Sequence, residues 1–257
     1  MLSDKQIRQF ATDGYLVVPG ALPLVMVEAA RRAVNHSIGH VGLGGEDLQR
    51  HRAGFHCAEL LDAPVITDLY NKSPVMDLAQ ELMGVGNVKP VKRAKAYPRF
   101  PLAPGQERRG LGGHLDGIGN GSNGQAKGAY NRNFSAFAVI YLADVAGERS
   151  GNFTVWPQSH RVFEAHFKEV GHQILAQGRP QVDLPEEPVM VTARAGDLVL
   201  AHHALMHGAC PNESPDVRLA AIARLSHVDV EELGPDAYLD IWREWPGVRR
   251  VLEAEPV

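Results

Sequence analysis

The chain has 257 residues and a formal net charge of −4, with 44% apolar and 22% charged residues, which is typical of a soluble globular protein. No block of Lys and Arg is long enough to predict nucleic-acid binding, and no apolar run approaches the roughly 20 residues of a membrane span. The two cysteines do not make a disulfide framework, and the polar N-terminus lacks the apolar core of a signal peptide. A cytoplasmic protein that binds neither nucleic acid nor a membrane is therefore expected.

The N-terminal part, about residues 1–85, is expected to be mainly helical. Its first helix begins with a capping box of Ser3 and Gln6 and ends at Gly14, a residue type that favours helix C-termini. The other elements expected here are a strand at 15–18, a helix from about 23 to 39, an unpatterned loop at 39–55 and a helix between Ser73 and Gly84.

Short strands dominate from about residue 86 to 228, and a helical tail is expected at about 234–252. The predicted strands are 88–97, 134–142, 153–156, 188–193, 197–201 and 219–225, with a helix near 160–176. Residues 98–133 form a long Gly-, Pro- and Asn-rich loop, a kind of segment that usually carries function. Helices followed by many strands predict a single α+β domain with an antiparallel sandwich or barrel core.

A candidate metal-binding pair lies inside this loop, at His114 and Asp116. On an extended segment, residues i and i+2 project to the same face, so the imidazole and the carboxylate can reach one ion. Neighbouring glycines at 112, 113 and 117 favour close approach of backbone or ligand over a packed strand. A third ligand from elsewhere would complete the two-histidine, one-carboxylate triad that is typical of non-haem iron(II) oxygenases.

Three histidines compete to be the third ligand: His202, His203 and His207. His203 and His207 are four residues apart, but no Glu follows His203, so the zinc-protease pattern is absent. The alternative for His202 and His203 is to end a strand and hydrogen-bond neighbouring backbone groups.

Arg218 opens an apolar strand eleven residues after His207. A cation at the start of a buried strand needs a partner, and a guanidinium suits a bidentate grip on a carboxylate. From spacing alone, a structural salt bridge with an internal acid is an equal alternative. Arg224 lies on the same strand face by parity and competes for the same role.

Three segments of the chain resemble the phytanoyl-CoA dioxygenase-like family of Fe(II)- and 2-oxoglutarate-dependent oxygenases. They are residues 13–20 (Asp-Gly-Tyr-Leu-Val-Val-Pro-Gly), residues 151–160 (Gly-Asn-Phe-Thr-Val-Trp-Pro-Gln-Ser-His) and the block from Gly196 to Arg218. Gln158 stands where the family commonly has glycine, a departure that could alter the turn. The resemblance extends from about residue 5 to 228.

This resemblance implies a double-stranded β-helix (jelly-roll, cupin-like) core with flanking helices. It implies a reaction in which O2 and 2-oxoglutarate are consumed, succinate and CO2 are released, and a C–H bond of a small-molecule substrate is oxidised. Related halogenases lack the carboxylate ligand, so Asp116 places the chain with hydroxylase-type members.

The resemblance also implies roles for individual residues. The iron ligands would be His114, Asp116 and His207. Arg218 would bind the distal carboxylate of 2-oxoglutarate, and Lys95 would assist it, with Arg93 and Arg99 as rivals for that second role.

Substrate contacts are expected around the long loop and near the mouth of the site. The candidates are Arg99, Asn120, Tyr130, Trp156 and His160. A polar, partly basic rim suits an anionic or hydroxylated substrate, although Trp156 could equally be core and His160 could cap a helix. A monomer or homodimer is expected.

Two other classes of function remain open from the sequence. One is a cupin-like metalloenzyme, a hydrolase or isomerase that uses no 2-oxoglutarate and whose Arg218 pairs internally. The other is a non-catalytic module that holds a small ligand on the same fold. Failure to bind iron, or to form succinate, would favour one of these.

Overall fold

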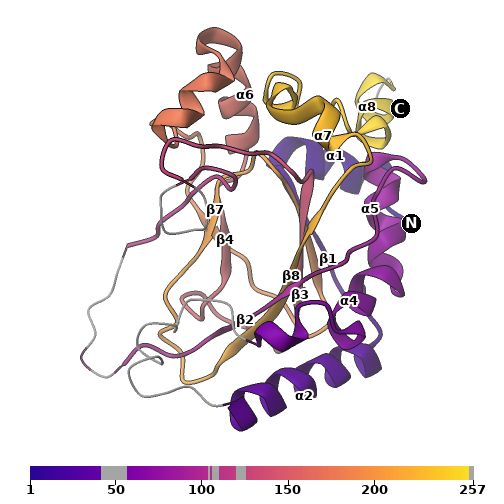
Figure 1. Cartoon of the computed structure of the whole chain (residues 1–257), viewed down its shortest axis with the longest axis vertical. Helices are drawn as coiled ribbons and strands as arrows, with labels where there is room; N and C mark the ends of the chain where they lie inside the picture. Colours follow the sequence, from indigo (N-terminus) through magenta and orange to yellow (C-terminus); the bar gives the residue numbers. More distant parts are fainter. Residues whose placement is uncertain (42–56, 104, 106–109, 120–125, 255–257) are drawn as a thin grey trace.

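The computed structural model describes residues 1–41, 57–103, 105, 110–119 and 126–254 (Figure 1). Residues 42–55 of the expected loop, and the candidate substrate contact Asn120, lie outside the described residues. None of the described helices has the length and apolar character that crossing a bilayer requires.

Two antiparallel sheets form the core. The larger has the order β1-β6-β3-β8-β2 and the smaller β5-β4-β7. Their bounds are β1 (Tyr15–Val18), β2 (Lys95–Arg99), β3 (Ala136–Tyr141), β4 (Phe153–Val155), β5 (Val189–Met190), β6 (Leu198–His202), β7 (His207–Ala209) and β8 (Arg218–Leu225). Figure 1 shows β4 and β7 facing β3 and β8 across the molecule, which is the expected jelly-roll arrangement.

Helices cover the outer face of the larger sheet. They are α1 (Asp4–Asp13), α2 (Leu24–Val41), α4 (Pro64–Asn71), α5 (Pro74–Met83) and α8 (Pro246–Glu253). The remaining helical segments are η1 (Ala58–Leu60), α6 (Ser159–Val170), η2 (His172–Gln177), α7 (Val230–Leu233) and η3 (Gly234–Tyr238). The expected capping box of Ser3 and Gln6 is present, and Gly14 ends α1 in the left-handed conformation.

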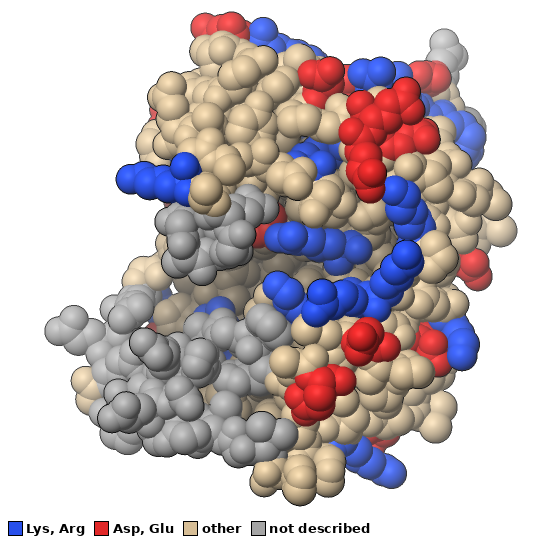
Figure 2. All heavy atoms as spheres, viewed as in Figure 1, with Lys and Arg blue, Asp and Glu red and all other residues tan. Residues whose placement is uncertain are grey.

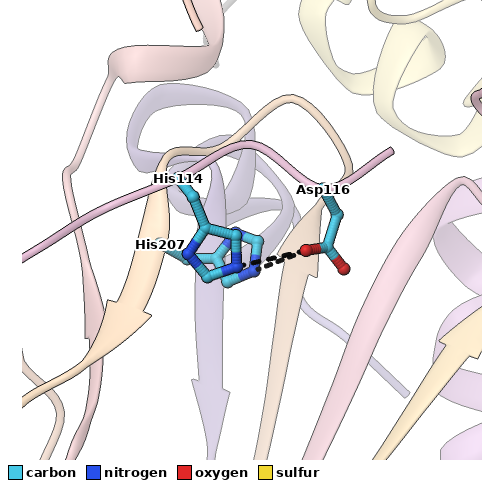
Figure 3. A group of neighbouring side chains, drawn as sticks. All are labelled: His114, Asp116 and His207. Carbon is cyan, nitrogen blue, oxygen red and sulfur yellow. Dashed lines mark ion pairs between the residues drawn. The ribbon is translucent and has the colours of Figure 1, made fainter. Parts of the chain in front are cut away.

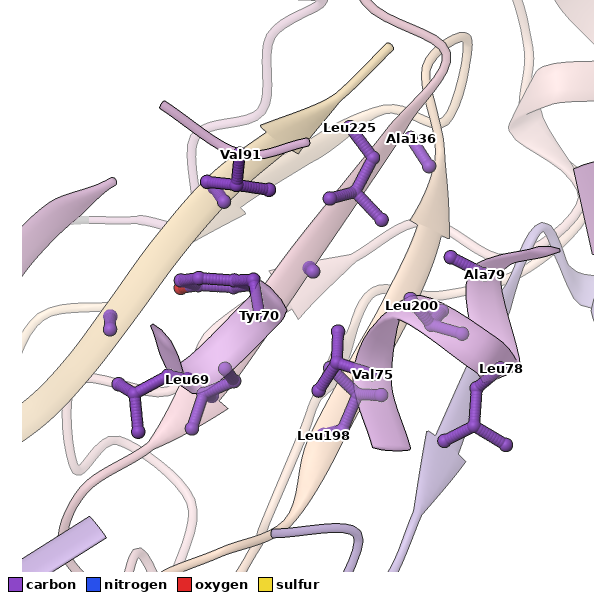
Figure 4. Packing of buried hydrophobic residues seen from close by; sticks show 14 of the residues in the cluster. Leu69, Tyr70, Val75, Leu78, Ala79, Val91, Ala136, Leu198, Leu200 and Leu225 are labelled. Atoms are coloured by element: carbon purple, nitrogen blue, oxygen red, sulfur yellow. The ribbon is translucent and has the colours of Figure 1, made fainter. Parts of the chain in front are cut away.

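β3, in the middle of the larger sheet, is apolar on both faces. Ala138 and Ile140 pack into the cluster beneath the helices, where Figure 4 shows Leu69 and Tyr70 of α4. Phe137 and Val139 point the other way, into the cluster between the two sheets. Alternate residues of one strand thus fill two different cores, and the inward face of the sheet is available to line a site.

The predicted strand at 88–97 is wrong at its start, because β2 begins only at Lys95. Pro90 has no N–H to donate to a ladder, which weakens pairing in this stretch. The side chain of Asn71 makes both hydrogen bonds that a neighbouring strand would make to Val91. Its amide donates to the Val91 carbonyl at 2.8 Å, and its carbonyl accepts from the Val91 N–H at 2.9 Å. Two elements, α4 and β7, were not predicted separately.

The predicted helix near 160–176 is divided at Gly171. Gly171 has φ 82°, so the α-helix α6 ends there and the chain continues as η2. The expected helical tail is likewise divided, into η3 and α8, with Pro246 in the first turn of the second helix.

Gln158 forms a turn before α6 at the position where the phytanoyl-CoA dioxygenase-like family commonly has glycine. It adopts φ 62° directly before α6, a left-handed conformation that costs a residue with a Cβ roughly 1–2 kcal/mol. We therefore expect Gln158→Gly to raise the free energy of unfolding by about 1 kcal/mol in urea denaturation, since the more flexible unfolded chain offsets part of the gain.

The matched control is Gln158→Ala. It removes the exposed hydrogen bond from Gln158 Nε2 to Glu186 Oε1 but keeps the Cβ, so it should bring no gain in stability. A glycine variant no more stable than the alanine variant would contradict the expected strain.

Candidate functional site

A cavity of about 480 Å³ opens between the two sheets. It is lined from β2, β3, β4, β7 and β8 and from the segment that carries His114 and Asp116. The lining residues are Leu61, Arg93, Lys95, Tyr97, Arg99, His114, Asp116, Phe137, Phe153, His207, Gly208, Ala209, Arg218, Ile222 and Arg224. Five of these side chains are cationic and one is a carboxylate.

The predicted metal ligands meet at this cavity. Nε2 of His114 lies 3.1 Å from Oδ1 of Asp116, and Nε2 of His207 lies 3.9 Å from the same oxygen. One ligand atom from each residue lies within 4.8 Å of the other two. Figure 3 shows both imidazoles on one side of the carboxylate, with their nitrogens directed toward it.

Backbone pairing brings the two histidines together from distant parts of the chain. The His114 N–H donates to the His207 carbonyl at 2.9 Å, and the His207 N–H donates to the His114 carbonyl at 3.1 Å. The segment with His114 therefore runs antiparallel beside β7. Gly113 is required there, since a Cβ would lie 2.4 Å from Met206 and 2.7 Å from the Trp156 ring.

The protonation states of His207 and Asp116 suit metal binding. Nδ1 of His207 lies 3.0 Å from the Leu205 carbonyl and donates to it, which leaves the lone pair on Nε2. Burial, followed by the charge of His114, lowers the pKa of His207 to about 4, so the ring is neutral near pH 7. Burial alone would raise the pKa of Asp116, but the hydrogen bond from His114 and the charges of His207 and Arg224 hold it well below its usual value.

Two imidazoles and one carboxylate on the same side of a cavity fit a divalent cation of the iron or zinc type. Such a set would hold the ion from one side and would leave room in the cavity for a further ligand. The donor set present in the structure therefore fits the group that the sequence predicts.

Arg224, which the sequence left as a rival to Arg218 for binding the cosubstrate, pairs with Asp116. Its Nε lies 3.1 Å from Oδ2 of Asp116, and its Nη2 pairs with the same oxygen. The guanidinium carbon lies 4.8 Å from the centre of the Phe134 ring. Oδ1 of Asp116 thus faces the histidines while Oδ2 faces Arg224, so this arginine pairs with the carboxylate of the candidate metal site.

Arg218 and Arg99 lie opposite each other on β8 and β2 at one end of the cavity. Arg218 donates from Nε to the Gly151 carbonyl at 2.8 Å and from Nη1 to the Tyr97 carbonyl at 3.0 Å. Arg99 donates from Nη1 to the Cys210 carbonyl at 3.3 Å.

Neither arginine has a carboxylate partner within the described part of the chain. Arg218 is 5% exposed, and burial lowers its pKa to about 10, which still leaves it charged near pH 7. The internal salt bridge that the sequence left open for Arg218 is therefore not formed by any described acid. A buried cation without a protein counter-ion is suited to an anionic ligand.

Gly151 makes room for both arginines. It has φ 72°, and a Cβ there would lie 3.1 Å from Arg99 Cδ and 3.2 Å from Arg218 Cβ. We expect Gly151→Ala to lower the free energy of unfolding by roughly 1–2 kcal/mol for the left-handed backbone alone, and also to displace the two guanidinium groups.

Gly20→Ala is the matched control for the backbone effect, because Gly20 has φ 59° and no atom within 4 Å of its added Cβ. Both variants should lose similar backbone stability by urea denaturation. Only Gly151→Ala should also lose affinity for a dicarboxylate such as 2-oxoglutarate, and equal affinities would contradict the steric role.

The cavity is lined by all three residues that the sequence offered as assistants to Arg218, namely Arg93, Lys95 and Arg99. Lys95 and Arg99 alternate with buried residues along β2, and Arg93 lies two residues before Lys95. Register places Arg99 opposite Arg218 and Lys95 opposite Ile222. Arg99 is thus the candidate beside Arg218, whereas Lys95 lies toward the other end of the cavity.

Tyr97, Phe137 and Phe153 line the cavity without having been predicted to do so. The Phe137 and Phe153 ring centres lie 4.4 and 5.7 Å from the centre of the His207 ring, so they form apolar walls beside this candidate metal ligand. The alternation of β2 could have indicated Tyr97, which lies between Lys95 and Arg99 on the same face.

Three predicted substrate contacts do not line this cavity. Tyr130 is hydrogen-bonded to Nδ1 of His172 at 2.8 Å. Trp156 is buried in an apolar cluster, as its alternative interpretation had it. His160 is fully buried, and its Nε2 lies 3.2 Å from a carbonyl of α1. Of the five predicted contacts, the structure brings Arg99 to the cavity.

His202 and His203 are not near the triad. His202 hydrogen-bonds backbone groups through both ring nitrogens, at 2.9 Å to the Ile241 carbonyl and 3.1 Å to the Ala204 N–H, as expected for a histidine that ends a strand. His203 is buried against Phe134 and Tyr238, and neither ring nitrogen has a hydrogen-bond partner among the described residues.

Comparison with known families adds an independent observation. A model of the phytanoyl-CoA dioxygenase family matches residues 122–220. The expected resemblance to the phytanoyl-CoA dioxygenase family is confirmed. The matched range contains His207 and Arg218, whereas His114 and Asp116 precede it and join the site through the pairing with β7.

Solved structures similar to this chain include three enzymes, each compared over most of its length. HygX from Streptomyces hygroscopicus, solved with nickel and 2-oxoglutarate, is 20% identical with a TM-score of 0.57, covering 89% of this chain and 88% of its own. The epimerase SnoN from nogalamycin biosynthesis is 18% identical with a TM-score of 0.56, covering 86% and 81%. The carbocyclase SnoK from nogalamycin biosynthesis is 20% identical with a TM-score of 0.50, covering 87% and 83%.

At these identities the likeness shows a shared fold. The jelly-roll core expected from the resemblance to the phytanoyl-CoA dioxygenase family is therefore confirmed. The comparison with curated proteins found no match by sequence.

Proposed function

We propose that this chain is an Fe(II)- and 2-oxoglutarate-dependent dioxygenase that hydroxylates a C–H bond of a small molecule and releases succinate and CO2. The observation that carries the proposal is the shared cavity: the His114, Asp116 and His207 triad and the buried Arg218 open into the same space. A metal site alone fits many reactions, but a metal site that faces a buried guanidinium with no carboxylate partner among the described residues fits a chelating dicarboxylate.

In the proposed enzyme, the triad holds iron(II) through Nε2 of both histidines and Oδ1 of Asp116. Bound there, iron(II) supplies the activation of O2 and the oxidation of the substrate. The protein keeps His207 neutral and Asp116 charged, and Arg224 fixes Oδ2 of that carboxylate so that Oδ1 stays directed at the metal position.

Arg218 binds the distal carboxylate of 2-oxoglutarate in this proposal, and Arg99 beside it adds a second guanidinium. Both already direct part of their donors to backbone carbonyls, which holds their side chains in place before the ligand binds. Phe137 and Phe153, which line the cavity beside His207, exclude water from the cosubstrate. Lys95, toward the opposite end, is better placed for the substrate than for this carboxylate.

Hydroxylation is the proposed outcome because Asp116 supplies the carboxylate ligand that related halogenases lack. SnoN is described as an epimerase and SnoK as a carbocyclase, so similar folds also support other oxidative outcomes. HygX was solved with iron in one structure and with nickel and 2-oxoglutarate in another. A cupin-like hydrolase or a binding module would not need the buried Arg218, which has no carboxylate partner in the described part of the chain. The proposal treats residues 1–257 as one catalytic domain.

The test is an anaerobic titration of iron(II) and 2-oxoglutarate into the metal-free protein, monitored for the weak visible metal-to-ligand charge-transfer band. A band that requires both additions supports the proposed site. Correctly folded protein that gives no band would rule the proposal out and favour the hydrolase or binding-module alternatives.

A further inference from the structure

The two candidate metal ligands of the long loop, His114 and Asp116, are held by different neighbours. His114 pairs with β7 through its backbone. The residues that follow Asp116 pair with another part of the loop: residues 117–119 and 129–131 run antiparallel, with backbone N–H···O=C distances of 2.6 and 2.8 Å. We call these two stretches the loop pair. Neither stretch belongs to the two sheets, so the place of the loop pair depends on its contacts with other elements.

Gly117 couples the position of Asp116 to that of the second stretch of the loop pair. It follows Asp116 directly and has φ 90°, and a Cβ there would lie 2.4 Å from the Asn131 carbonyl oxygen. The next residue, Ile118, is paired with Tyr130. The two backbones are therefore in close contact, and a shift of the second stretch would carry the carboxylate of Asp116 with it.

Tyr130 connects the loop pair to the outside of the domain through His172. The Tyr130 hydroxyl lies 2.8 Å from Nδ1 of His172, and Nε2 of His172 lies 3.1 Å from Oδ1 of Asp236. Because the carboxylate accepts, Nε2 carries the proton and Nδ1 accepts from the tyrosine hydroxyl. The His172 side chain is 12% exposed, so water competes little for its bond to Tyr130. His172 begins η2 and Asp236 lies in η3, so three separate parts of the chain meet in this chain of hydrogen bonds.

Arg132 makes a second connection from the same stretch to the C-terminal part of the chain. Its Nη1 donates to the Gly234 carbonyl at 3.1 Å, and its Nη2 pairs with Glu244 where both side chains are buried. Gly234 directly follows α7, and Figure 2 shows acidic side chains gathered over α7, beside the hollow in this face of the molecule. Removing one partner of a buried ion pair destabilises the whole fold, so the bond of Tyr130 is the connection that can be removed alone.

We propose that Tyr130 and His172 are positioning residues of the metal site, whose hydrogen bond holds the loop pair, and through it Asp116, where the carboxylate reaches the ion. This inference rests on the proposed function and adds two residues that do not line the cavity. In the metal-free protein, the bond lowers the population of conformers in which Asp116 is displaced from His114 and His207. Iron(II) binds only the conformers with all three ligands in place, so its apparent affinity falls with the fraction that is displaced.

Tyr130→Phe tests the proposal, because it removes the hydroxyl and keeps the ring that packs on the neighbouring apolar cluster. In the metal-free variant, amide hydrogen exchange of residues 113–119 should become about two- to tenfold faster, the equivalent of one hydrogen bond. The affinity for iron(II) should fall in the same range. It is measured under anaerobic conditions from the charge-transfer band at saturating 2-oxoglutarate, and thermal unfolding of the whole protein should change little.

Two further variants show whether the effect passes through His172. His172→Ala should give the same changes as Tyr130→Phe, and the double variant should be no worse than the stronger single one, because both remove one shared bond. Tyr15→Phe is the matched control: it also removes one tyrosine hydroxyl, but from β1, at the edge of the larger sheet opposite β2. It should change neither the exchange of residues 113–119 nor the affinity for iron(II).

The outcomes separate this inference from the proposed function. If Tyr130→Phe leaves the exchange of residues 113–119 unchanged, the hydroxyl does not hold the loop pair and the inference is wrong. If exchange becomes faster but the affinity for iron(II) stays the same, the bond is merely structural and the positioning role is equally overturned. In both cases the band of the unaltered protein leaves the oxygenase proposal standing. If the unaltered protein gives no band, the oxygenase proposal fails and this inference fails with it.

Discussion

Replacing Asp116 with alanine is expected to abolish both iron(II) retention and turnover. The variant removes the oxygen that faces His114 at 3.1 Å and His207 at 3.9 Å, and it leaves two histidines as the remaining ligands. The loss should exceed the roughly 10–100-fold drop in metal affinity that follows from removing a residue that only orients a ligand. Metal content after dialysis and succinate formation measure the two effects separately.

His114→Ala should give the same result through the loss of one imidazole. His114 is largely exposed, so its removal should cost little folding stability, and thermal unfolding of the metal-free variants provides that check. Asp216→Ala is the matched control, since Asp216 is an exposed aspartate that does not line the cavity. Full activity in either ligand variant would show that the triad is assigned wrongly.

Replacing Arg218 with alanine is expected to weaken 2-oxoglutarate binding by about 2–5 kcal/mol, the usual range for losing one partner of a buried charge pair. This corresponds to roughly a 30-fold to several-thousand-fold rise in Kd. The reason is that Arg218 is buried and charged and lacks a described counter-ion, so the ligand carboxylate would be its ionic partner. Titration of the charge-transfer band with 2-oxoglutarate measures the affinity.

Conservative and neighbouring variants separate this role from a purely structural one. Arg218→Lys keeps the charge but not the planar fork, so its affinity should lie between those of the wild type and the alanine variant. Arg99→Ala should have a smaller effect, because the described residues hold that guanidinium through Nη1 alone, at 3.3 and 3.5 Å. An unchanged affinity in Arg218→Ala would move the role to Arg99, the cation that lies opposite Arg218.

Local chemistry was sufficient for several parts of this protein. The capping box at Ser3 and the left-handed Gly14 follow from residue types a few positions apart, and both are present in the structure. The two-residue period of extended chain predicted that His114 and Asp116 share a face, and that Arg218 and Arg224 share another. Both pairs line the cavity. These features depend only on neighbours along the chain, so the sequence alone can predict them.

The tertiary structure decided the features that depend on long-range pairing. The antiparallel bridge between His114 and His207 selects His207 over His203, which is equally a histidine near a strand end but is buried elsewhere. Arg224 was a candidate for the cosubstrate until the fold placed it on Asp116. These features depend on which strands pair and which charged groups come within hydrogen-bond distance. Hydrogen bonds and ion pairs act through space, so the spacing of residues along the chain does not predict them.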